Sequence, residues 1–160
     1  MRIRPASPAD LENILALYAG ARACMALSGN PGQWAGGYPA REKVEADIAG
    51  GWCHVCEEEG RLYAAFALIP GEDPTYGRID GAGKNGRPYA TLHRVASSGA
   101  RPGMMDLIVA WAFERYPNLR GDTHERNLPM RRAFERNGFE RCGIIWVEDG
   151  TERIAYQKEK

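Results

Sequence analysis

Two stretches of the sequence have the residue types and spacing of an anion-binding site. Residues 97–105, SSGARPGMM, form a glycine-containing turn between an expected strand ending LHRVA and an expected helix that begins at Met104. Such a turn gathers free backbone N–H groups at the positive end of a helix, which favours phosphate binding. Residues 121–127, GDTHERN, make a second strand-to-helix junction. If the two strands are parallel neighbours, both junctions meet at one edge of the sheet and form a cleft for a phosphate-bearing ligand.

The block containing these stretches resembles the GCN5-related N-acetyltransferases (GNAT), which move an acetyl group from acetyl-CoA to an amine. The pyrophosphate loop of that family reads Q/R-x-x-G-x-G/A, after a strand with Val five residues upstream. The counterparts here are Val95, Ala100, Gly103 and Met105, of which the loop's middle glycine matches. Asn127 at a helix start and Gly138-Phe139 at its end also fit the family. The resemblance covers nearly the whole chain and implies a single N-acetyltransferase domain over residues 1–160.

The resemblance implies acetyl-CoA as cosubstrate, bound largely by main-chain groups. N–H groups from Arg101 to Met105 would face the pyrophosphate, although Pro102 has none and Met105 replaces the usual Gly or Ala. The Arg101 side chain offers a charge-assisted replacement, as do Arg131 or Arg132. Unpaired backbone at Val95 and Ala96 would pair with the pantetheine arm. The predicted cofactor-binding residues are Val95, Ala96, Arg101, Gly103, Met104, Met105 and Asn127, and Asn127 is equally suited to be a helix cap.

Acetyl transfer requires a base, because an ammonium cannot attack. Histidine titrates near neutrality, and this makes His93 and His124 the candidate catalytic residues. His93 is two residues before Val95, so regular strand geometry predicts that both side chains share a face. His124 ends the next strand, where Asp122 either orients it or serves as a structural carboxylate. A structural role is the alternative for both histidines, and Glu57 and Glu58 are reserve bases acting through water.

The acid that many relatives use is missing. Phe134 stands at the position of their tyrosine, which protonates the departing thiolate; Tyr156 or His124 are possible substitutes. A thiol leaves readily as thiolate, so the loss need not abolish the chemistry. The degenerate loop and the missing tyrosine keep a second hypothesis open, a non-catalytic CoA-binding or sensor module. A structural domain without a cofactor is a third, weaker one.

The acceptor is expected to be a primary amine of a small molecule or a protein. Trp34 and Tyr38, in a Gly- and Pro-rich loop, either fill the edge of the core or line a pocket. Together with Tyr76, in a turn-rich excursion that is expected to be exposed, they are the predicted substrate-binding residues. Asp47 or a glutamate nearby is a candidate partner for a cationic substrate. Relatives often dimerise, so a homodimer is possible.

The elements that must position these residues follow from local patterns. Apolar spacing predicts helices after residue 7, over 41–49, over 104–116 and after Asn127, with Gly138 ending the last and Phe139 touching Phe134. Strands are expected near both termini, in a hairpin over 52–71 that turns at Gly60, at the two junctions, and in a closing hairpin at Asp149-Gly150. The expected fold class is α/β (α+β): a mixed, largely antiparallel seven-stranded GNAT-type sheet with helices on both faces and splayed central strands.

Composition narrows the possible partners. The 160 residues are 44% hydrophobic, enough for one domain that buries roughly 70% of its unfolded surface. Lys and Arg number 21 and equal Asp and Glu, so no net charge favours nucleic acid or an anionic membrane. No stretch has signal-peptide character or approaches roughly 18 apolar residues, so a cytoplasmic protein is expected. Cys53 and Cys56 have C-x-x-C spacing, but strand geometry points them to opposite faces, so no metal is predicted and the four thiols are expected to be buried.

Overall fold

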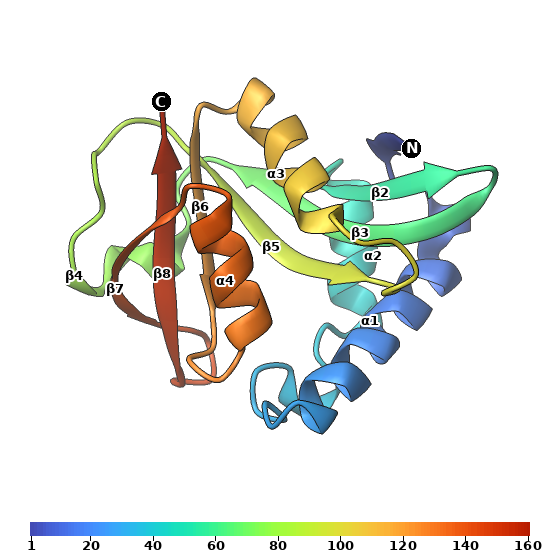
Figure 1. The fold of residues 1–160 in the computed structure, drawn as a ribbon, viewed down its shortest axis with the longest axis horizontal. Coiled ribbons are helices and arrows are strands. Elements are labelled where there is room, and N and C mark those ends of the chain that lie inside the picture. The colour runs from blue at the N-terminus through green and yellow to red at the C-terminus, as the bar shows by residue number, and fades with distance from the viewer.

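The computed structural model describes all 160 residues as one eight-stranded sheet with helices on both faces (Figure 1). The strands lie in the order β1-β2-β3-β5-β6-β8-β7-β4. Their bounds are β1 Arg2–Pro5, β2 Cys53–Glu58, β3 Arg61–Pro70, β4 Ile79–Gly81, β5 Ala90–Ser97, β6 Asn118–Thr123, β7 Glu140–Trp146 and β8 Glu152–Glu159. The α-helices are α1 Leu11–Leu27, α2 Arg41–Ala49, α3 Met104–Arg115 and α4 Leu128–Arg136. Short 3-10 turns are η1 Pro8–Asp10, η2 Ala35–Gly37 and η3 Pro74–Gly77. None of the helices combines the length and apolar character needed to cross a membrane.

The two halves of the sheet meet at β5 and β6, the one parallel pair. Their pairing starts at Ala90 opposite Leu119 and ends at Leu92 opposite Gly121, although β5 continues to Ser97. Beyond that point the strands part, as expected, and we call this opening the splay. The Phe134 ring packs against Gly121 so closely that a Cβ there would lie 2.7 Å from ring carbons. A glycine is therefore required where the strands begin to separate.

A β-bulge in β5 decides which side chains point to which face. Arg94 has φ of 50°, a left-handed conformation that is uncommon outside glycine, and the β3–β5 register shifts beside it. As a result Leu92 and Val95, three residues apart, both contact the core beneath α3 and α4. The expectation that His93 shares a face with Val95 is therefore wrong, because the bulge changes the alternation and turns His93 to the opposite face.

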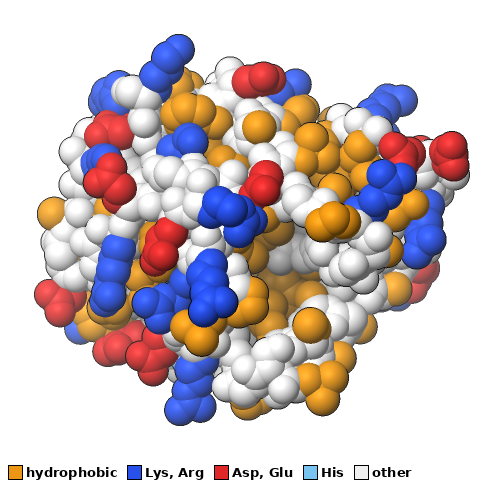
Figure 2. Space-filling model, viewed as in Figure 1, with side chains coloured by type: hydrophobic (Ala, Val, Ile, Leu, Met, Phe, Trp, Pro, Cys, Tyr) orange, Lys and Arg blue, Asp and Glu red, His pale blue; other side chains and the backbone are white.

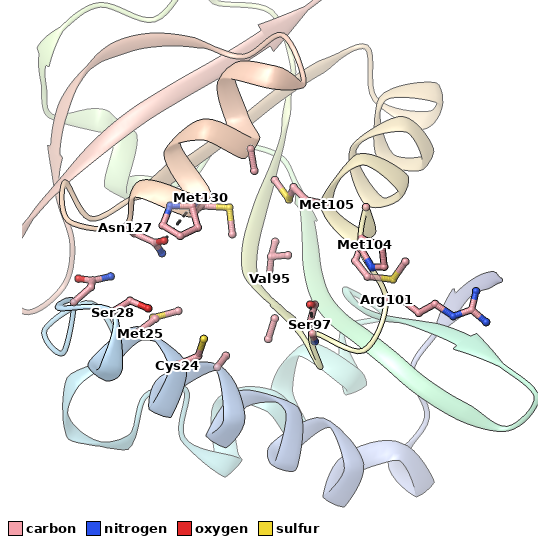
Figure 3. A pocket seen from close by; sticks show the side chains of 18 of the residues that line it. Cys24, Met25, Ser28, Val95, Ser97, Arg101, Met104, Met105, Asn127 and Met130 are labelled. Atoms are coloured by element: carbon pink, nitrogen blue, oxygen red, sulfur yellow. Dashed lines mark hydrogen bonds between the residues drawn. The ribbon is translucent and has the colours of Figure 1, made fainter.

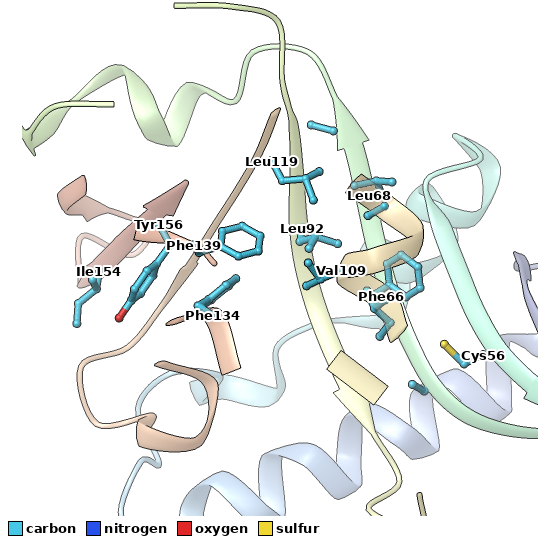
Figure 4. Packing of buried hydrophobic residues seen from close by; sticks show 14 residues of the cluster. Cys56, Phe66, Leu68, Leu92, Val109, Leu119, Phe134, Phe139, Ile154 and Tyr156 are labelled. Atoms are coloured by element: carbon cyan, nitrogen blue, oxygen red, sulfur yellow. The ribbon is translucent and has the colours of Figure 1, made fainter. Parts of the chain in front are cut away.

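Hydrophobic clusters cover both faces of the sheet. The larger one, shown in Figure 4, includes Phe66, Leu119, Phe134 and Tyr156 and packs beneath α3 and α4. The second lies under α1 and α2 and includes Ile14, Tyr18 and Val44. Cys56 belongs to the first and Cys53 to the second, which confirms that the C-x-x-C sulfurs point to opposite faces. Cys24, in contrast, is exposed on α1 and Cys142 is half-buried on β7, so the expectation of four buried thiols is wrong for these two residues.

Helix α4 begins and ends as its sequence predicts. The Asn127 Oδ1 accepts a hydrogen bond from the Met130 N–H at 3.2 Å. Gly138 has φ of 78°, and the Phe139 N–H bonds the Phe134 carbonyl at 3.0 Å. The two phenylalanine rings lie 4.9 Å apart between centroids. These contacts define both ends of α4.

The sheet has one strand more than the seven expected. Within the stretch expected to be an exposed excursion, β4 pairs with β7 at the sheet edge. Gly81 lies opposite Gly143, and a Cβ on Gly81 would approach the Cys142 carbonyl oxygen to 2.2 Å. Two facing glycines permit this approach, and their turn-like character conceals the strand in the sequence.

Candidate active site

A pocket of about 420 Å³ opens at the splay, between the C-terminal end of α1 on one side and the N-terminal ends of α3 and α4 on the other (Figure 3). Figure 2 shows it as a hollow lined by hydrophobic side chains, with Lys and Arg side chains beside it. All the predicted cofactor-binding residues line this pocket: Val95, Ala96, Arg101, Gly103, Met104, Met105 and Asn127. Residues far apart in the sequence thus meet in one cavity.

The turn into α3 presents free main-chain donors to this pocket. Gly103 has φ of 76° and precedes α3, and the first helical bond runs from the Leu107 N–H to the Gly103 carbonyl. The N–H groups of Arg101, Gly103, Met104 and Met105 have no protein acceptor. Space around Gly103 is open. The turn therefore fits a diphosphate despite the absence of an N–H on Pro102.

The arginines near the turn are mostly engaged by acidic partners. The Arg101 guanidinium pairs with Glu58 on β2 and points away from the pocket, so Arg101 does not present its charge to the pocket (Figure 3). Arg136 lines the pocket but is held by Asp106 at 2.8 Å. Arg131 and Arg132 are not among the lining residues, whereas Arg126 lines the pocket and forms no ion pair.

Methionines make the walls of the pocket flexible and apolar. Met25, Met104, Met105 and Met130 line it, which leaves Met1 as the one methionine elsewhere. Unbranched thioether side chains adapt their shape to a ligand. The cavity is open with these side chains in place, so Met105 does not close the turn. Met25 and Met130 were missed by sequence reasoning, because no local pattern links α1 to α4.

Both the oxygen and the nitrogen of the Asn127 side-chain amide form hydrogen bonds within the protein. Its Oδ1 caps α4, and its Nδ2 donates to the Gln33 Oε1 at 2.9 Å. Gln33 Oε1 also accepts from the Asn30 Nδ2 at 2.9 Å. The loop between α1 and α2 is thereby joined to the β6–α4 junction. One amide N–H of Asn127 remains for another acceptor.

His93 forms the closest histidine–carboxylate contact in the molecule. Its Nε2 lies 2.5 Å from the Asp73 Oδ2, and no protein group bonds its Nδ1. Burial opposes ionisation of Asp73, but hydrogen bonds from His93 and Thr75 outweigh it and lower the pKa of this carboxyl well below its usual value. His93 does not line the pocket; it faces the other side of the splay, on the sheet face opposite α3 and α4.

Asp122 and Tyr76 lie across the splay from His93. The Tyr76 hydroxyl donates to the Asp122 Oδ2 at 3.0 Å. Burial raises the pKa of Asp122, and the charges of His93 and Arg153 nearby partly oppose that rise. Asp122 therefore bonds Tyr76 rather than orienting His124. Tyr76 is buried, which corrects its expected position on an exposed excursion.

Trp34 and Tyr38 lie beside a buried ion pair instead of in the pocket. Asp47 receives two hydrogen bonds from Arg94, at 2.7 and 3.0 Å, and the Arg94 Nη1 bonds the Tyr38 hydroxyl at 3.1 Å. Trp34 packs edge-on against Tyr18. Asp47 is therefore not free to hold a cationic substrate. A substrate contact by the aromatic residues stays a prediction.

His124 and Tyr156 are placed less favourably for catalysis. The His124 Nδ1 accepts the Arg126 N–H at 3.1 Å, and burial together with the Arg153 charge lowers the pKa of this imidazole. The Tyr156 ring stacks on Phe134 in the core, and its buried hydroxyl has no partner. Neither residue lines the pocket, and a role for either stays a prediction.

Comparison with known proteins identifies the family. No protein-family model matches the sequence, and no curated protein does. A GNAT-family acetyltransferase from Streptococcus agalactiae 2603 matches 99% of this chain and 95% of its own, with 33% sequence identity and a TM-score of 0.91. A GNAT-family acetyltransferase from Listeria monocytogenes 4b F2365 shares the fold at 22% identity, over 99% of this chain and 94% of its own, with a TM-score of 0.75. A GNAT-like decarboxylase in complex with isobutyryl-CoA shares the fold at 15% identity, over 99% of both chains, with a TM-score of 0.70. At 33% identity over nearly its whole length, the chain belongs to the GNAT family of acetyltransferases.

Proposed function

We propose that the protein transfers an acetyl group from acetyl-CoA to the primary amine of a small molecule or protein, by direct attack with both substrates bound. The observation that carries this proposal is the pocket at the splay, where free N–H groups at the start of α3 and the unpaired edge of β5 line one cavity. Acetyl-CoA, when bound, supplies an activated thioester. The N–H groups of Gly103, Met104 and Met105 hold its diphosphate.

The edge of β5 that faces the splay binds the pantetheine arm of acetyl-CoA. Because pairing with β6 ends at Leu92, the main-chain groups of Val95 are available to pair with the pantetheine arm as an added strand, whereas Ala96 pairs with Ala65 of β3 and lines the same pocket. A free N–H there also stabilises negative charge that develops on the acetyl oxygen. Asn127 donates its remaining amide N–H to the arm, and Gln33 keeps that amide oriented.

His93 acts as the general base on the other side of the splay. Its Nδ1 has no protein partner and accepts a proton from the attacking amine, while Asp73 holds the ring through Nε2. Phe134 supplies no hydroxyl where relatives carry tyrosine. None is required, because a thiol with a pKa of about 8.5 leaves readily as thiolate.

The second candidate, a CoA-binding module without turnover, is favoured by one observation, the buried phenyl ring of Phe134 at the expected acid position. Two assays separate the proposals. Acetyl-CoA at millimolar concentration should raise Tm in both, by mass action. Release of CoA thiol in the presence of an amine panel supports the enzyme, and a Tm shift without turnover on any amine supports the binding module. The absence of a shift contradicts both.

A further inference from the structure

A buried arginine without an acidic partner lies on the acceptor side of the splay. Arg153, on β8, is only 5% exposed and forms no ion pair with any carboxylate, unlike the buried Arg94, which pairs with Asp47. Burial lowers the pKa of the Arg153 guanidinium, the direction expected for a desolvated cation. An isolated buried charge is costly to a fold and is uncommon away from functional sites.

The hydrogen bonds of Arg153 leave part of its guanidinium free. Nη1 donates to the Thr151 Oγ1 at 2.9 Å and to the Glu152 carbonyl at 2.7 Å, and Nη2 donates to the Gln33 carbonyl at 3.0 Å. All three acceptors are neutral. Of the five N–H donors, one on Nε and one on Nη2 have no protein acceptor. None of the fully enclosed polar atoms that lack a partner belongs to Arg153, so the free Nε–H remains open to solvent.

The position of Arg153 connects it to the pocket and to the candidate base. On β8, Ile154 pairs with Thr123 and Ala155 with Asp122, so Arg153 lies one residue beyond the C-terminal end of β6, the end at which β6 has parted from β5. Gln33 accepts Arg153 through its carbonyl and Asn127 of the pocket through its side chain. His93 and Arg153 both act electrostatically on Asp122.

Neighbouring acids do not neutralise Arg153. Among the acids, Asp122 has the strongest charge interaction with Arg153. Its carboxylate nevertheless accepts a hydrogen bond from Tyr76 and forms no ion pair with Arg153. Asp149 accepts hydrogen bonds from Thr151 instead. The guanidinium therefore keeps one N–H on Nε and one on Nη2 without an acidic partner, and two nitrogens of one guanidinium can donate to both oxygens of a carboxylate.

We infer that Arg153 binds a carboxylate of the acceptor, so that the preferred substrate is a small amine that also carries a carboxylate, such as an amino acid. The acetylation of this acceptor rests on the proposed function. The contact between its carboxylate and Arg153 does not. The carboxylate neutralises the buried guanidinium, and the amine of the same molecule is then directed toward the splay and His93.

Matched pairs of substrates test this without any mutation. L-phenylalanine and phenethylamine, and L-leucine and isopentylamine, differ only by the carboxylate. We expect kcat/KM for the amino acid to exceed that for its decarboxylated partner by about 100-fold, the value of a buried charged contact. Binding is measured in parallel as the Tm shift that each compound adds in the presence of CoA, so a preference is detectable even without turnover.

Variants then assign the preference to Arg153. Arg153→Gln should reduce the amino-acid-to-amine ratio to about one, and Arg153→Lys, which keeps the charge but loses the fork, should restore part of it. Arg141→Gln, an exposed arginine on β7, is the matched control and should keep the wild-type ratio. Ratios are compared within each variant, so a general loss of stability does not imitate the effect.

The outcomes are distinguishable. Equal kcat/KM and equal Tm shifts for both members of each pair overturn the inference, as does a preference that persists in Arg153→Gln. A carboxylate preference in Tm shift without acetylation of any compound supports the inference while contradicting the proposed function.

Discussion

The two sides of the splay present different kinds of chemical group. The donor side, which faces the turn from Ser97 to Gly103 and the start of α3, presents main-chain N–H groups and methionine side chains. The acceptor side, on the opposite face of the sheet, presents side chains in fixed pairs: His93 with Asp73, Asp122 with Tyr76, and Arg94 with Asp47. Main-chain contacts tolerate substitution, whereas side-chain contacts depend on residue type. We therefore expect mutations to affect stability and specificity on the acceptor side more than on the donor side.

The largest expected effect is on the Arg94–Asp47 pair. Asp47→Ala leaves a guanidinium buried without its partner and should reduce the free energy of unfolding by about 3–5 kcal/mol, measured by urea denaturation. The exposed pair of Glu12 with Arg41 is the control, and Glu12→Ala should cost less than about 1 kcal/mol. Equal losses in both variants would show that the acceptor side is not a rigid framework.

Next in size is the loss of the base. His93→Gln should lower kcat/KM by about 100-fold or more, because it removes proton transfer, while the Kd of CoA stays unchanged because the donor side is intact. His124→Gln, the matched histidine control, should change kcat/KM by less than about threefold. A His93→Gln enzyme with full activity across neutral pH would remove His93 from the mechanism.

A smaller effect concerns acid stability. The pKa of Asp73 is depressed in the folded protein, so its contribution to stability is complete above the ordinary value of 3.8 and is lost as pH falls toward the folded pKa. The free energy of unfolding should therefore fall less steeply below pH 3.8 in Asp73→Asn than in the wild type. Identical slopes in urea titrations at several pH values would mean that Asp73 gains nothing from His93 and Thr75.

The smallest expected effect is on the donor side, in the Kd of CoA. Met105→Ala removes a pocket-lining side chain but no N–H group, so the Kd of CoA should change by less than about threefold. Gly103→Ala, in contrast, forces a residue with a Cβ into φ of 76° and should cost about 1–2 kcal/mol of stability and weaken CoA binding. Isothermal titration gives both Kd values. A stronger effect of Met105→Ala than of Gly103→Ala would mean that side chains, not the backbone, hold the cofactor.

The same contrast explains what was predictable from the sequence. The donor side is local in sequence, since Gly103 opens α3 and Asn127 with Gly138 bounds α4, and each of these features has a short signature. The acceptor side joins residues 20 positions apart for Asp73 with His93, 47 for Asp47 with Arg94 and 120 for Gln33 with Arg153. No short sequence motif indicates pairs of residues that are so far apart in the chain. The bulge at Arg94 was also hidden, because a positive φ on arginine has no marker in the sequence and reverses the predicted face of His93.

The most direct test is a crystal structure of the protein with CoA. We predict the pantetheine arm between β5 and β6 along Val95 and Ala96, the diphosphate on the N–H groups of Gly103, Met104 and Met105, and the sulfur at the splay within reach of an amine held beside His93. A CoA molecule bound elsewhere, with the splay filled by the protein's own side chains, would contradict the account.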